Sequence, residues 1–172
     1  TLGHIKTVKP NAINRAIKEH RFICGTCTTH KNEIRVGTFL KILFKDTNYN
    51  ILYSYHLQTR CKKAQECDYL IITDKNRYIN IEANGRQHYE YVPCFHKNQE
   101  AFERTIERDQ ARREWCKDND WELIEIDQRE VEKKEFERMY SKFEELDLDL
   151  DMEFEDVYEE LRNTSITEIY QI

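Results

Sequence analysis

The chain has 172 residues, of which 39% are hydrophobic and 35% charged, with only four glycines and two prolines. This composition excludes a disordered chain and is typical of a soluble domain with a core of its own. No apolar run approaches the roughly 18 residues of a membrane-spanning helix, and the N-terminus lacks the apolar segment of a signal peptide. We therefore expect an intracellular protein, cytoplasmic or nuclear, without a membrane partner.

The formal net charge of -6 is unevenly distributed along the chain. Residues 144–172 contain 11 acidic residues and one arginine, whereas residues 1–143 contain 26 Lys+Arg against 22 Asp+Glu. The mildly basic part is compatible with a nucleic-acid partner. The acidic part is either a solvated face or a docking segment for a protein partner. The sequence thus divides into an N-terminal helix and CxxC segment (1–30), a core (31–143) and an acidic helical extension (144–172).

Hydrophobic periodicity predicts a mixed order of helices and strands. A turn at Asp74-Lys75-Asn76 joins two apolar strands and indicates a β-hairpin. The predicted helices cover 11–21, 28–45, 98–119, 130–143 and 155–163, and the predicted strands cover 51–58, 67–73, 77–84 and 121–127. This order favours a mixed α/β (α+β) fold, in which helices flank a central mixed sheet.

A CxxC pair, Cys24 and Cys27, precedes the core. The remaining four cysteines form no second pair of this kind, although His20 and His30 lie nearby in the sequence. The pair therefore predicts either a structural zinc site or two ordinary buried thiols. A zinc enzyme is not supported, because the sequence contains no HExxH motif.

Two acidic residues, Glu33 and Asp109, lie on the apolar sides of their predicted helices. The residues expected on the same side are Gly37, Leu40 and Phe44 for the first helix and Phe102, Ile106 and Cys116 for the second. A single acid of this kind is usually a boundary residue that reaches solvent. Because an unpaired buried carboxylate is costly, two such acids also predict cationic or hydrogen-bonding partners.

A third acid, Glu82, lies inside a predicted strand, and Asp68 opens the neighbouring strand. The period of two residues predicts two faces: Ile79, Ile81 and Ala83 on one, and Asn80, Glu82 and Asn84 on the other. If the two strands pair, Asp68 and Glu82 meet, and two carboxylates suit Mg²⁺ or Mn²⁺. His88, just beyond the strand, supplies a group that exchanges a proton near neutral pH. Metal-assisted phosphodiester hydrolysis uses this set of groups.

Glu33 and Asp68 precede the string Glu-x-Asn-Gly-x-Gln-His-Tyr, which begins at Glu82. A helix with Phe…Arg-Asp and an alternating strand follow, and the whole arrangement covers about residues 31–127. The arrangement resembles the branch of the PD-(D/E)XK nucleases that is described by the motif EDxHD. This branch includes phage homing endonucleases and the very-short-patch mismatch repair endonuclease. The residues that match are Glu33, Asp68, Glu82, Gln87, His88, Phe102, Arg108 and Asp109.

The resemblance implies a restriction-endonuclease-like core, Mg²⁺- or Mn²⁺-dependent cleavage of DNA, and a viral or phage origin. Asp68 and Glu82 would hold the metal, His88 would act on a proton, Asp109 would orient His88, and Glu33 would complete the catalytic site. A single strand-cleaving site also implies a homodimer wherever both strands are cut. The residues expected to contact nucleic acid are Arg86, Gln87, Arg108 and Arg113.

Asn84 stands where the family usually has lysine and where members with this string often have aspartate. The loss of a charge there motivates an alternative, in which a nuclease fold without activity serves as a nucleic-acid-binding or assembly module. A third hypothesis is a protein-interaction domain that uses exposed tyrosines and acidic helices. The CxxC pair is similar to the second half of a zinc ribbon that precedes the nuclease core in some phage relatives.

Overall fold

The computed structural model describes residues 31–57, 59–60 and 65–164; the predicted helix 11–21 and the Cys24–Cys27 pair lie outside these ranges. In this part of the chain, the helices are α3 (Lys31–Leu43), α4 (Gln99–Asp118), α5 (Glu132–Glu145) and α6 (Phe154–Asn163). The strands are β1 (Asn50–Leu57), β2 (Gln65–Ile72), β3 (Tyr78–Asn84) and β4 (Glu122–Asp127), and a short 3-10 helix, η1 (Arg86–His88), follows β3. Each predicted element within the described residues is therefore present, with small differences at its ends.

The four strands form one mixed sheet in the order β1-β2-β3-β4. β1, β2 and β3 pair antiparallel, and the β2–β3 connection is the predicted hairpin, closed by a hydrogen bond from the Thr73 N–H to the Arg77 carbonyl of 3.0 Å. β4 pairs parallel with β3 after α4 crosses over, so Asn84 and Asp127 lie side by side at the carboxyl ends of these strands. The predicted mixed α/β architecture is thus confirmed.

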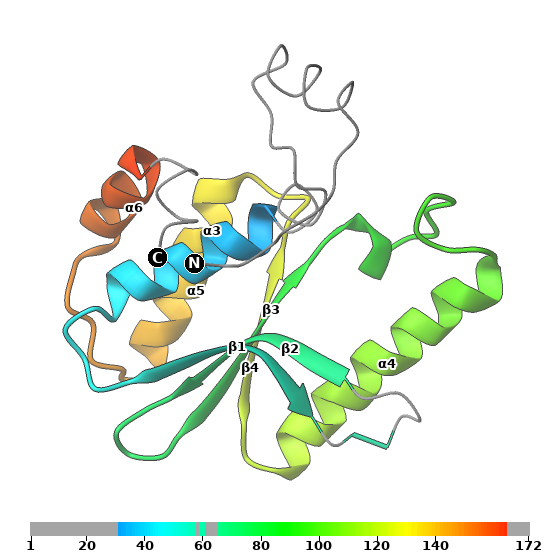
Figure 1. The fold of residues 1–172 in the computed structure, drawn as a ribbon, viewed down its shortest axis with the longest axis horizontal. Helices are drawn as coiled ribbons and strands as arrows, with labels where there is room; N and C mark the ends of the chain where they lie inside the picture. Colours follow the sequence, from blue (N-terminus) through cyan, green and yellow to red (C-terminus); the bar gives the residue numbers. More distant parts are fainter. Residues whose placement is uncertain (1–30, 58, 61–64, 165–172) are drawn as a thin grey trace, which may run out of the picture.

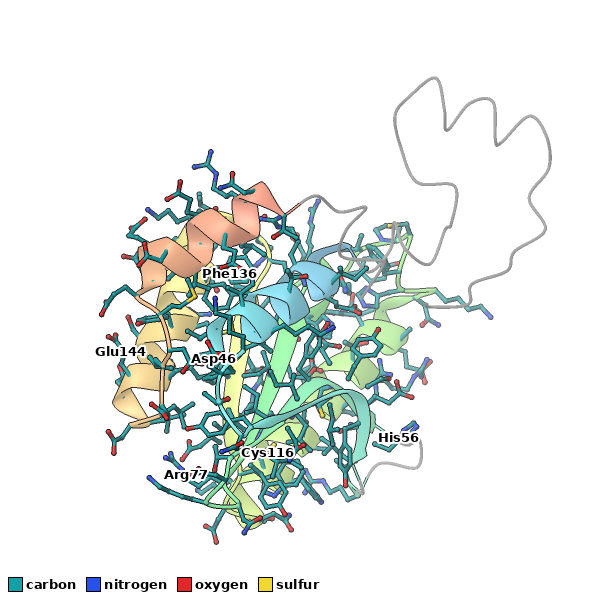
Figure 2. All side chains as sticks on the ribbon, turned by 60° about the vertical axis from the view of Figure 1, so that its left-hand side comes forward. Asp46, His56, Arg77, Cys116, Phe136 and Glu144 are labelled. Atoms are coloured by element: carbon teal, nitrogen blue, oxygen red, sulfur yellow. The ribbon has the colours of Figure 1, made fainter. Side chains whose placement is uncertain are left out.

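Helices cover both faces of the sheet (Figure 1): α3, α5 and α6 lie on one side and α4 on the other. The side with three helices holds the larger core, in which Ile79, Ile81 and Ala83 of β3 pack as the alternation predicts. Figure 2 shows Phe136 of α5 among these helices, where its ring stacks on Phe39 with ring centroids 4.8 Å apart. The opposite face of β3 therefore points its polar side chains toward α4.

The acidic extension contributes to this core through α6. Phe154, Val157 and Leu161 recur with helical spacing and pack with α3 and α5, whereas the acidic residues of the same helix face outward. Helix α6 is therefore an integral layer of the fold. Within the described part of the chain, no helix is both long and apolar enough to cross a membrane.

Helix α4 begins where Asn98 caps it, because the Asn98 side chain accepts a hydrogen bond of 2.9 Å from the Ala101 N–H. Its sheet-facing residues are Phe102, Thr105, Asp109, Arg112 and Cys116. Ile106, which the sequence places on the same side, is 45% exposed, so that prediction was wrong. The buried side of α4 is centred between Asp109 and Arg112, and Ile106 lies beside it on the exposed part of the helix surface.

Helix α3 approaches β2 closely at Gly37. A Cβ atom at Gly37 would lie 2.1 Å from the Tyr69 hydroxyl oxygen and 2.4 Å from its Cζ. Gly37→Ala should therefore lower the free energy of unfolding by about 1–3 kcal/mol, despite the better helix propensity of alanine. Urea unfolding measures this effect, with Lys41→Ala on the exposed side of α3 as the control. An unchanged midpoint for Gly37→Ala would show that Tyr69 moves aside at no cost.

Candidate active site

The predicted acidic residues gather at the end of the sheet where β3 finishes and β2 begins. Because these strands are antiparallel, Asp68 near the start of β2 lies beside Glu82 and Ala83 near the end of β3. His88 follows in η1, and Asp109 reaches the same place from α4. Four residues that are distant in the sequence thus come together at one edge.

Asp68 occupies a break in the hydrogen-bond ladder of the sheet. The paired register of β2 and β3 reaches Tyr69 and Ile81, and beyond it Asp68 Oδ2 accepts a hydrogen bond of 2.8 Å from the Ala83 N–H. The β1–β2 register also omits Asp68 and Ser54, and Ser54 has a φ of 55°. A side chain therefore replaces a main-chain acceptor here, which fixes the Asp68 carboxylate at the strand end.

Burial raises the pKa of the Asp68 carboxyl to about 6. The hydrogen bond from Ala83 and the positive charges of Arg112 and His88 oppose this rise, and the negative charge of Glu33 adds to it. Asp68 therefore changes its charge in the pH range where many hydrolases work. A cation bound at this carboxylate would compete with the proton.

Glu82 is the most deeply buried acid of the group and is 3% exposed. Its Oε2 lies 2.7 Å from Nη1 of Arg112, which is 8% exposed. Burial raises the pKa of Glu82 well above its usual range, and the Arg112 charge opposes this only in part. The second oxygen, Oε1, is buried and has no hydrogen-bond partner among the described residues. The Asn80 amide nevertheless acts on Glu82 and lowers its pKa, so Arg112 and Asn80 are the two groups that stabilise the ionised form of this carboxyl.

His88 and Asp109 form a pair. His88 Nδ1 lies 2.9 Å from Asp109 Oδ2, and Asp109 is 4% exposed. The other Asp109 oxygen lies 3.8 Å from Nη1 of Arg112. A buried carboxylate against Nδ1 fixes the imidazole ring and leaves Nε2 as the nitrogen that can exchange a proton.

Glu33 reaches this edge from α3, on the other side of the sheet. The Tyr69 hydroxyl donates a hydrogen bond of 3.1 Å to the Glu33 carbonyl, and the Tyr53 hydroxyl lies 3.5 Å from the Glu33 carboxylate. The negative charge of Glu33 contributes to the raised pKa of Asp68. The predicted position of Glu33 beside the other acids is thus compatible with the structure.

The four residues expected to contact nucleic acid lie in different surroundings. Arg86 is exposed and bonds Glu90, and the Gln87 side chain folds back over Gly85. Arg113 makes two hydrogen bonds to Glu125, of 2.9 and 2.8 Å. Arg108 alone of the four lines a cavity together with His88 and Asp109.

Two side chains at this edge were missed by sequence reasoning, Arg112 and Gln65. Arg112 follows Asp109 by three residues, so the helical spacing already places it on the same side of α4. Gln65 bonds the Arg108 carbonyl through its amide nitrogen at 2.9 Å, a contact between segments that no local pattern reveals. A buried cation beside the acids is the main feature that the sequence analysis lacked.

The donor set at the edge suits a hard divalent cation. Within the described ranges, no group of three or more His, Cys, Asp or Glu side chains is arranged to hold a metal. Mg²⁺ does not need such a cage, because one or two carboxylates, water and a substrate phosphate complete its octahedron. Asp68 and Glu82 supply two carboxylates, of which Glu82 also pairs with Arg112. The residues present therefore fit Mg²⁺ or Mn²⁺.

Two viral proteins are similar to a short part of this chain. One is the uncharacterized protein 307L of Invertebrate iridescent virus 6, which is 48% identical over 48 residues. The other is the uncharacterized protein 033L of Invertebrate iridescent virus 3, which is 40% identical over 48 residues. The match covers 28% of this chain and about a quarter of each relative, 24% and 25%. No family model and no solved structure matches. The viral relatives support the expected viral origin.

Proposed function

We propose that this chain is a divalent-metal-dependent DNA endonuclease with a restriction-endonuclease-like core. The observation that carries the proposal is the gathering of Asp68, Glu82 and the His88–Asp109 pair at one edge of the sheet. Two oxygen-donor carboxylates next to an oriented imidazole form a set of groups suited to phosphodiester hydrolysis. The resemblance to the EDxHD branch of the PD-(D/E)XK nucleases rests on the same residues.

Asp68 and Glu82 would hold Mg²⁺ or Mn²⁺, which supplies Lewis acidity for the scissile phosphate and a more acidic bound water. His88 Nε2 accepts a proton from the attacking water or returns one to the leaving oxygen. Asp109 holds the ring of His88 through Nδ1 and stabilises its protonated form. Glu33 adds negative charge beside Asp68 and so strengthens the preference of the edge for a cation.

The topology supports the proposed core. An α-helix, three antiparallel strands, a crossover helix and a parallel fourth strand follow one another in the chain, with helices on both faces of the sheet. This arrangement has the element order expected for a restriction-endonuclease-like core. A homodimer would bring two such edges to a DNA duplex and allow both strands to be cut.

Supercoiled plasmid with Mg²⁺ or Mn²⁺ tests the proposal. The chain should nick the plasmid, and His88→Ala should slow nicking by about 100- to 10,000-fold because a positioned proton carrier is lost. Glu82→Gln should abolish metal-dependent nicking while keeping a side chain of nearly the same shape. The measurement is the conversion of supercoiled to open-circular DNA over time.

A matched control separates these effects from damage to the fold. Glu122→Gln, on the exposed start of β4, removes a carboxylate away from the edge and should leave nicking unchanged. Nicking that survives both His88→Ala and Glu82→Gln would overturn the site. Failure to cleave any DNA would overturn the proposed activity.

A second candidate function is a nuclease fold that binds nucleic acid without cutting it. Two contacts favour it: Asn84 donates a 3.1 Å hydrogen bond to Glu125, away from the carboxylates, and Arg112 already neutralises Glu82. A mobility shift of DNA without cleavage under any metal would select this function. The acidic outer side of α6 would then be a candidate surface for a protein partner.

A further inference from the structure

A cavity of about 270 Å³ opens between the start of β2 and α4, beside the proposed catalytic edge. Its walls come from Gln65 and Glu66 of β2, from His88, and from Arg108, Asp109 and Arg112 of α4. Neither Asp68 nor Glu82 lines it. The volume exceeds the roughly 30 Å³ that one water molecule occupies, so a larger polar group fits there.

Two lining side chains carry buried polar atoms that lack a hydrogen bond within the described part of the chain: Gln65 Oε1, an acceptor, and Arg112 Nε, a donor. Both residues are more than nine-tenths buried. The amide nitrogen of Gln65 donates to the Arg108 carbonyl, which fixes the oxygen as the unsatisfied end of the side chain. Each unsatisfied buried group costs about 1–3 kcal/mol, so a ligand that satisfies both is favoured.

The cavity wall holds two guanidinium groups, Arg108 and Arg112, and two acids, Glu66 and Asp109. Arg108 bonds the Arg104 carbonyl through Nε and the Thr105 hydroxyl through Nη2, and Arg112 pairs with Glu82. Both acids already have partners: Asp109 lies against His88 on the same wall, and Glu66 contacts Ser54 and His56 of β1. Guanidinium groups are well suited to phosphate oxygens.

We infer that this cavity binds a phosphate monoester or inorganic phosphate, with anionic oxygens at Arg112 Nε and Arg108 and a P–OH group donating to Gln65 Oε1. The acceptor at Gln65 is what selects this chemistry. An internal phosphodiester and a sulfate ion carry no proton near neutral pH, so each would leave Gln65 Oε1 unsatisfied. The inference deepens the proposed function, because His88 and Asp109 line the cavity, but it requires neither Asp68 nor Glu82.

Isothermal titration calorimetry at pH 6 tests the inference, because a phosphate monoester has a second pKa of about 6 and retains its proton in part. Sodium phosphate and sodium sulfate are compared at matched ionic strength in the presence of EDTA. The chain should bind phosphate at least about 10-fold more tightly than sulfate, as expected from one satisfied buried acceptor. Equal affinities for the two anions, or no phosphate binding, would overturn the assignment.

Variants place the anion in the cavity. Gln65→Met should remove the preference for phosphate over sulfate, and Arg108→Gln should weaken phosphate binding about 10-fold. Arg104→Gln is the matched control, since Arg104 lies one turn earlier on α4 and pairs with Glu100. Retained preference in Gln65→Met, or equal losses in Arg104→Gln and Arg108→Gln, would contradict the site.

The phosphate can come from the end of a nucleic-acid strand or from the free ion. Oligonucleotides of one sequence distinguish these sources when their 5′ or 3′ end carries either a phosphate or a hydroxyl group. Tighter binding of a phosphorylated end, measured by fluorescence anisotropy in EDTA and lost in Arg108→Gln, identifies the end of a nucleic-acid strand. Binding of inorganic phosphate without any gain from a phosphorylated end identifies the free ion. Either result supports a monoester-type site.

Discussion

Replacing Arg112 with methionine should lower the free energy of unfolding by about 3–5 kcal/mol at pH 8. The guanidinium lies 2.7 Å from Glu82 Oε2, and both side chains are buried. Methionine fills a similar volume but removes the cation that lowers the pKa of Glu82, so the buried group must stay as an unpaired carboxylate or take up a proton, and both cost stability. Urea unfolding at pH 8 measures the loss.

The double variant Glu82→Gln/Arg112→Met distinguishes the lost charge balance from lost packing. It removes both charges, so it should recover most of the stability that Arg112→Met loses. Arg113→Met is the neighbouring control, because Arg113 is partly exposed and pairs with Glu125 near the surface. A double variant no more stable than Arg112→Met would show that packing of the arginine side chain is the main contribution.

Asp68→Asn should stabilise the fold at neutral pH by about 2–3 kcal/mol. The pKa of the Asp68 carboxyl is about 6 in the folded chain and near 3.8 when unfolded. Between these values the folded chain binds the additional proton, so the stability of the natural protein falls as the pH rises from about 4 to 6 and stays reduced above. Asparagine keeps an acceptor for the Ala83 N–H and never ionises.

The gain should therefore be absent below about pH 4 and complete above about pH 6, as measured by thermal or urea unfolding across this range. Asp74→Asn, in the exposed turn between β2 and β3, is the control and should change little. The same Asp68→Asn variant should lose metal-dependent nicking. Carboxylates that serve a function often lower the stability of the fold that holds them. An equal gain at all pH values would contradict the ionisation of Asp68 as its cause.

Regular periodicity explains why the elements could be predicted from the sequence. Ile79, Ile81 and Ala83 alternate with Asn80, Glu82 and Asn84, and the structure separates the two sets as expected, with Ile79, Ile81 and Ala83 in the large core. The role of α6 in the core was harder to predict, because many acidic residues surround its few apolar ones in the sequence. These apolar residues, Phe154, Val157 and Leu161, pack against α3 and α5.

The site could be predicted only in part, for two physical reasons. Arg112 looks like a solvated helix residue in the sequence, and only the fold shows that it is buried against Glu82. Asp68 gains its position from the break in pairing around Ser54, and such an irregularity depends on tertiary contacts. The acids themselves were found because carboxylates on apolar faces are unusual.

The packing of α6 against α3 has a consequence for how the chain folds. These helices stand at opposite ends of the described sequence, and the parallel β3–β4 pair forms only after α4 has crossed over. During synthesis, the apolar surfaces of α3 and of the β2–β3 hairpin therefore stay exposed until nearly the whole chain has been made. Such long-range closure slows folding and exposes β-strands to aggregation. Truncation after residue 143 should accordingly yield insoluble protein rather than a smaller folded core.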